Sequence, residues 1–98
     1  MIKWTRTNHR HALSSQYALF IQCSRRQRWL HENKRIWNTV TWLRKTYGDD
    51  ARREDVEGPN GRRMYRMVPN EHWFIDRNRR RIYVKEEKAL TLMALVLG

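Results

Sequence analysis

The sequence is poor in cysteine and in long apolar runs. It has one cysteine, Cys23, so no disulfide can form within the chain, which suits a reducing compartment. The longest apolar run, residues 92–97, is far shorter than the ~20 residues that a membrane-spanning helix needs. The first residues lack the apolar stretch of a signal peptide. A cytoplasmic location is therefore expected.

Catalytic signatures are also absent. The sequence has no phosphate-binding glycine loop, no metalloprotease motif and no serine-hydrolase motif. Nothing in the spacing of the four histidines places one beside Cys23 to activate a thiol. A zinc site from His9, His11, Cys23 and His31 lacks the short paired spacing of structural zinc. The five acids in residues 49–57 indicate a solvated run rather than a magnesium cluster. The expectation is a protein that is no enzyme and has no cofactor.

Positive charge is what the sequence has in abundance. Its 98 residues include 21 Lys or Arg against 10 Asp or Glu, for a net charge of +11. Most of this excess lies in residues 1–48, where ten basic residues face one acid. A surface this basic attracts nucleic acid, acidic protein or anionic membrane. Membrane binding is disfavoured because no basic helix has a clean apolar face.

The length predicts a single small domain of four segments. Residues 1–12 are polar and basic and are expected to form a flexible arm. Residues 13–48 form a helical half, and residues 49–57 form an acidic linker. Residues 58–98 are expected to hold a β-meander followed by a C-terminal helix.

The helical half contains the clearest helix, over residues 33–47. Its apolar residues repeat every three or four positions, and Gly48 follows where a helix-ending glycine is common. Trp37 and Trp42 flank this apolar seam and either widen the buried face or reach a partner. Residues 13–24 favour a second helix, although a strand over residues 17–23 fits the nearly continuous apolar run.

The second half predicts a three-stranded antiparallel meander. Its strands are residues 62–68, 71–76 and 79–85, separated by turn signals that include Pro-Asn-Gly. A three-residue final loop would pair Phe74 with Ile82, whereas a two-residue loop would pair Trp73 with Ile82.

The predicted fold class is α+β, with N-terminal helices, the meander and an apolar C-terminal helix that covers one face of the sheet. That last helix is apolar all round, so it packs either in its own core or in a partner's groove.

The candidate binding residues lie at the tip of the last hairpin and in the strand beside it, and they are Trp73, Arg77, Arg79, Arg80 and Arg81. Such an arginine cluster can contact successive phosphates, pair with an acidic protein groove, or keep a sheet edge from aggregating. Pro69 is a separate candidate, because X-Pro bonds isomerise slowly and prolyl isomerases act on accessible turns. An ordinary trans proline is the alternative.

The whole chain resembles a known phage family. The resemblance rests on the Met-Ile-Lys-Trp start, the Trp37 to Trp42 helix, and residues 73–81 with their run of arginines. On these residues the chain is similar to the second anti-RecBCD proteins of P22-like lambdoid phages. No catalytic signature accompanies the resemblance.

The resemblance implies a modulator or inhibitor that binds the host RecBCD helicase-nuclease, chiefly through its RecC subunit. Such a protein changes how double-stranded DNA ends are processed, and it protects or recombines phage DNA in the cytoplasm of the infected host. It also implies that a host cyclophilin-type peptidyl-prolyl isomerase joins the complex, with Pro69 as the expected contact and Pro59 as the alternative. The competing hypothesis is a small basic DNA-binding protein that uses the arginine-rich hairpin.

Overall fold

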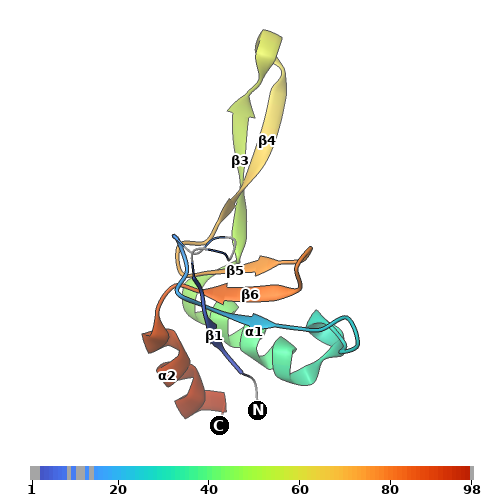
Figure 1. The fold of residues 1–98 in the computed structure, drawn as a ribbon. Helices are drawn as coiled ribbons and strands as arrows, with labels where there is room; N and C mark the ends of the chain where they lie inside the picture. Colours follow the sequence, from blue (N-terminus) through green and yellow to red (C-terminus); the bar gives the residue numbers. More distant parts are fainter. Residues whose placement is uncertain (1–2, 9, 11–12, 14, 98) are drawn as a thin grey trace.

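The computed structural model describes residues 3–8, 10, 13 and 15–97 and confirms an α+β fold with antiparallel sheets (Figure 1). The strands are β1 (Thr5–Arg6), β2 (Leu19–Gln22), β3 (Ala51–Glu57), β4 (Arg63–Pro69), β5 (Trp73–Asp76) and β6 (Arg81–Val84). The helices are α1 (Lys34–Tyr47) and α2 (Glu87–Leu97), with short 3-10 turns η1 (Leu30–Glu32) and η2 (Pro59–Gly61).

Four strands form the main sheet, in the order β1-β2-β6-β5, with every pair antiparallel. Alternate side chains of these strands point to opposite faces, as the pleat requires. One face packs on α1 and buries a core that includes Ile21, Trp73, Ile75, Ile82 and Val84. The other face carries a smaller aromatic cluster of Tyr17, Phe20 and Tyr83.

Helix α1 follows from local sequence signals, and its prediction is confirmed. The Asn33 side chain accepts a hydrogen bond from the Ile36 N–H at the start of the helix. Ile36, Val40 and Leu43 are buried along the predicted seam. Gly48 ends the helix at φ 89°, a conformation that glycine adopts without a steric penalty.

Helix α2 is only partly packed on the body. Its Ala89 and Met93 side chains are buried in the core between the main sheet and α1. Leu95 and Val96 in its last turn are 80% and 66% exposed. In Figure 1 this helix lies at the end of the body opposite to the tip of β3 and β4.

Strands β3 and β4 form a separate two-stranded sheet, joined by η2, that stands away from the body (Figure 1). We call residues 51–69 the projecting hairpin. The molecule measures 51 × 29 × 29 Å, and its Cα radius of gyration is 15.0 Å. A compact chain of this length has a radius of about 13 Å, so the hairpin accounts for the elongation.

The predicted meander is wrong in its pairing. β4 pairs with β3 along its whole length, whereas β5 and β6 join the main sheet. The register of the last hairpin also differs from both predicted options. Ile75 lies opposite Ile82, and a four-residue turn, residues 77–80, joins the strands. Arg80 takes φ 54°, which allows this longer turn to close.

Three predicted segments need correction. Residues 19–22 form β2, so the strand alternative holds and the predicted N-terminal helix over residues 13–24 is wrong. Residues 51–57 of the predicted linker form β3, because cross-strand pairing with β4 satisfies their backbone. Thr5 and Arg6 of the predicted flexible arm pair with β2. Residues 1–2, 9, 11 and 12 of that arm lie outside the described residues.

Candidate partner-binding site

The β5–β6 connection, residues 77–80, carries three of the four predicted arginines and is called the basic turn, whereas Arg81 is the first residue of β6. Arg77 is exposed, and its Nη1 lies 3.5 Å from the Oδ2 of the buried Asp50. The same Asp50 oxygen accepts the Ile75 backbone N–H at 3.4 Å. Asp50 immediately precedes β3, so Arg77 links the basic turn to the root of the projecting hairpin.

Arg79 is tied to the strand that leads into the turn. Its Nη1 lies 2.9 Å from Oδ2 of the buried Asp76, whose other oxygen accepts the Arg79 backbone N–H. The hydrogen bond to this carboxylate raises the pKa of the Arg79 guanidinium above its ordinary value. Arg79 is exposed, but its charge already has a partner.

Arg80 and Arg81 are half-buried and have structural partners. The Arg80 guanidinium donates a hydrogen bond to the Gln27 carbonyl and lies 5.7 Å from the ring centre of Trp29. The Arg81 guanidinium donates to the Gln22 side chain at 2.7 Å and covers the Phe20 ring at 4.7 Å. Substituting either arginine would disturb the fold as well as the surface.

The placement of Trp73 is a correction. Its side chain is 0% exposed, and its indole N–H donates to the Gly48 carbonyl at 2.9 Å. The residue therefore belongs to the core, where the helix-side face of β5 meets the end of α1. It cannot contact a partner while the fold is intact.

Pro69 lies at the accessible root of the projecting hairpin. It ends β4 opposite Ala51, is exposed, and follows a trans peptide bond. The next residue, Asn70, is held firmly: its side chain donates to the carbonyls of Tyr47 and Asp49 and accepts the His72 N–H. Pro69 is thus an exposed proline beside a fixed junction.

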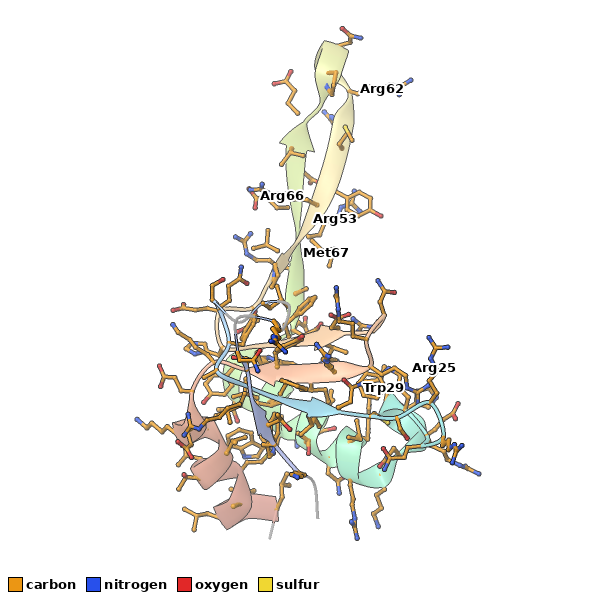
Figure 2. All side chains as sticks on the ribbon, in the orientation of Figure 1. Arg25, Trp29, Arg53, Arg62, Arg66 and Met67 are labelled. Carbon is orange, nitrogen blue, oxygen red and sulfur yellow. The ribbon has the colours of Figure 1, made fainter. Side chains whose placement is uncertain are left out.

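Sequence reasoning missed the exposed apolar side chains of the projecting hairpin. Met64, Tyr65 and Met67 are 50%, 59% and 56% exposed, because the hairpin has no second layer to bury them. Tyr65 and Met67 share one face, where the Arg53 guanidinium lies 4.4 Å from the Tyr65 ring centre. Figure 2 shows Arg53, Arg66 and Met67 along the hairpin, well above the main sheet.

The signal that could have located these side chains is the Pro-Asn-Gly turn itself. Gly58 donates its N–H to the Arg62 carbonyl across that turn, which makes residues 51–57 the partner strand of β4. Glu54 then lies opposite Arg66, with an N···O distance of 3.3 Å. Opposite charges in such cross-strand pairs stabilise a hairpin.

Within the described ranges, no group of three His, Cys, Asp or Glu side chains could hold a metal ion. Cys23 is buried there, and its thiol donates to the Arg28 carbonyl at 3.2 Å. Neither α1 nor α2 is long and apolar enough to cross a membrane.

No protein-family model, curated protein or solved structure matches this chain. The projecting hairpin and the basic turn are therefore the features of this chain that bear on its function.

Proposed function

We propose that this chain is a non-enzymatic modulator of the host RecBCD helicase-nuclease that binds through the RecC subunit. Bound there, it alters the processing of double-stranded DNA ends and favours survival or recombination of phage DNA in the infected cell. The family named above supplies the identity of the partner. The observation that carries the binding role is the projecting hairpin, whose apolar side chains have no packing role in the body of the chain.

The projecting hairpin suits a protein partner. Tyr65 offers an aromatic ring with a polar tip, and Met64 and Met67 are flexible side chains that adapt to an irregular surface. Interfaces concentrate their binding energy in such anchors, with arginine as a frequent companion. Arg53 already lies on the Tyr65 ring, so an aromatic and an arginine anchor stand together.

The basic turn lies at the root of the projecting hairpin, where Arg77 pairs with Asp50, and it is the proposed rim of the binding surface. Arg77 and Arg79 are exposed but paired with Asp50 and Asp76. Rim charges chiefly speed up association and make it sensitive to salt, and they contribute little to the final affinity. Their pairing also reduces the free charge that this turn could offer to DNA phosphates.

Pro69 is the proposed contact for a cyclophilin-type prolyl isomerase. The proline is exposed and lies beside the hydrogen-bonded Asn70 junction. An isomerase bound at this position would cover the root of the hairpin and leave its tip free for RecC.

The test is capture of purified RecBCD by the tagged chain, after nuclease treatment has removed nucleic acid that could bridge the two proteins. Changing Met64, Tyr65 and Met67 together to Ser should weaken capture at least about tenfold, because anchor residues each contribute more than about 1 kcal/mol. The control changes Leu95 and Val96 to Ser, since these apolar side chains are even more exposed but belong to α2. Circular dichroism should show that both variants keep the fold.

Undiminished capture by the hairpin variant would refute its role, and loss only in the control would move the site to α2. A second readout is degradation of linear duplex DNA by RecBCD. The unaltered chain should change it, and the hairpin variant should not.

A further inference from the structure

A basic pocket lies between the basic turn and the loop that follows β2. This loop pocket has a volume of about 490 Å³, and its lining includes Arg25, Arg26, Arg28, Trp29, Glu32 and Arg80. Figure 2 shows Arg25 and Trp29 close together at the end of the body near the start of α1. The apolar side chains of the projecting hairpin are not part of its lining.

The pocket is held by hydrogen bonds rather than formed by a loose loop. The Cys23 N–H donates to the Arg80 carbonyl at 2.9 Å, which joins the loop to the basic turn. Inside the loop, the Ser24 N–H donates to the Gln27 side chain, and the Gln27 N–H donates back to Ser24. The Arg80 guanidinium then bonds the Gln27 carbonyl and lies over Trp29, forming one wall.

The pocket also contains unpaired positive charge. Arg25, Arg26 and Arg28 are exposed, and their guanidinium groups have no hydrogen-bond or ion-pair partner in the part of the chain that the structure describes. The buried Nε of Arg80 likewise lacks an acceptor among those residues. Glu32 is the one acid in the lining, and it is exposed. Four arginines thus face a single carboxylate.

The basic turn differs in this respect. Arg77 and Arg79 each have a buried carboxylate partner, which a phosphate would have to displace. The arginines of the loop pocket have no such competitor in the described chain. An anionic ligand is therefore attracted more strongly to the pocket than to the turn that the sequence singles out.

We propose that the loop pocket binds the phosphodiester backbone of single-stranded nucleic acid. Guanidinium groups bind phosphate oxygens in two-point contacts, and a chain of phosphates suits three arginines close together in sequence. Trp29 lines the same pocket and offers an indole surface to a base, a combination that single-strand binding sites use. In a single strand, an unpaired base can rotate and enter a small pocket. In a duplex, the bases are paired and stacked, so they cannot enter it.

This second activity does not rest on the proposed function. It would let the chain hold a nucleic-acid strand while the projecting hairpin contacts a protein. The two surfaces can therefore be tested separately.

The experiment measures fluorescence anisotropy of a labelled 12-nucleotide oligothymidine with the full chain. The pocket variant changes Arg25, Arg26 and Arg28 to Gln. The control variant changes Arg62, Arg63 and Lys45 to Gln, which removes the same charge from exposed residues outside the pocket. The pocket variant should bind at least about tenfold more weakly at low salt. The slope of log affinity against log salt concentration should also become less steep by about two units, as expected for three lost phosphate contacts.

Equal weakening in both variants would overturn the proposal, because it would mean that net charge alone attracts DNA. Tighter binding of a polyglutamate peptide, or of duplex DNA, with the same dependence on the three arginines would also overturn it. A second measurement uses the unaltered chain, so its result does not depend on whether the pocket variant folds. In the unaltered chain, oligothymidine should shift the NMR signal of the Trp29 indole N–H, assigned with Trp29→Phe, and an unmoved signal would contradict the pocket.

Discussion

Asn70 is the residue that joins the projecting hairpin to the body. Its amide side chain donates to the carbonyls of Tyr47, the last residue of α1, and of Asp49, and its own N–H donates to the Asp50 carbonyl at 2.7 Å. The Tyr17 hydroxyl donates to the Asn70 carbonyl from the other side. One residue therefore connects the helix end, both hairpin strands and the aromatic face of the main sheet.

The first prediction concerns this junction. Asn70→Ala should lower the free energy of unfolding by about 2 kcal/mol, because three side-chain hydrogen bonds are lost and each contributes about 1 kcal/mol or somewhat less. Chemical denaturation measures the change. The control is Asn78→Ala in the exposed basic turn, which should cost less than about 0.5 kcal/mol. Equal losses in the two variants would mean that the hydrogen bonds of Asn70 add nothing to the stability.

The second prediction concerns pH. Burial, followed by the nearby charge of Asp50, raises the pKa of Tyr17 from its ordinary 10.0 to about 12. The protonated phenol is therefore favoured in the folded state. Its contribution to stability is full below pH 10 and is lost as the pH rises from 10 to about 12.

Denaturation at several alkaline pH values tests this. The unaltered chain should lose stability over this interval more steeply than Tyr17→Phe, which has no phenol at position 17 to ionise. Tyr65→Phe, at an exposed position, is the control and should follow the unaltered chain. Parallel curves for all three proteins would contradict the role of Tyr17.

At the scale of elements, helix α1 could be predicted because its signals are local. The apolar spacing, Asn33 and Gly48 lie within one short stretch, and each acts on its own helix. The strands could be found but not paired, because pairing joins residues far apart in sequence. β2 and β6, for example, lie about sixty residues apart and still form neighbouring strands.

The projecting hairpin shows a second reason why strands and their pairing are not predicted from the sequence. A strand is recognised by alternation when one face is buried, but β3 and β4 are open to solvent on both faces. β3 therefore has no apolar pattern, and its acids resembled a linker. The sequence also cannot place Trp73, since a tryptophan near arginines is compatible with a partner-binding surface as well as with the core in which it lies.

The third prediction tests the end of α1. Gly48→Ala should lower the free energy of unfolding by about 1–2 kcal/mol, because a Cβ at φ 89° is strained although no neighbouring atom lies within 4 Å. Gly61→Ala, at φ 72° in the hairpin turn, is the comparison. It should leave cooperative unfolding of the body nearly unchanged, as measured by thermal denaturation. An unaffected Gly48→Ala protein would show that the helix end tolerates the strain.

At the scale of the whole molecule, the body and the projecting hairpin are separate in their stabilisation. The buried cores lie between the main sheet and α1 and on the opposite face of that sheet. Neither core contains a residue of β3 or β4. The body should therefore fold without most of the hairpin.

The fourth prediction follows. Replacing residues 53–67 with Asn-Gly keeps the root pairs Ala51–Pro69 and Arg52–Val68 and supplies a two-residue hairpin turn. The shortened chain should still unfold cooperatively. Its radius of gyration should fall from about 15.0 Å to about 12 Å by small-angle X-ray scattering. Loss of cooperative unfolding would show that the hairpin helps to stabilise the body.

The independence of the projecting hairpin has a consequence for how such a protein can evolve. A substitution at Tyr65 or Met67 changes no packed core, so selection for folding leaves these positions free to vary. Selection for a particular partner can then act on them directly. Under the proposed function, a lineage that meets an altered partner can adapt by exchanging this one segment, while the scaffold beneath it is inherited unchanged.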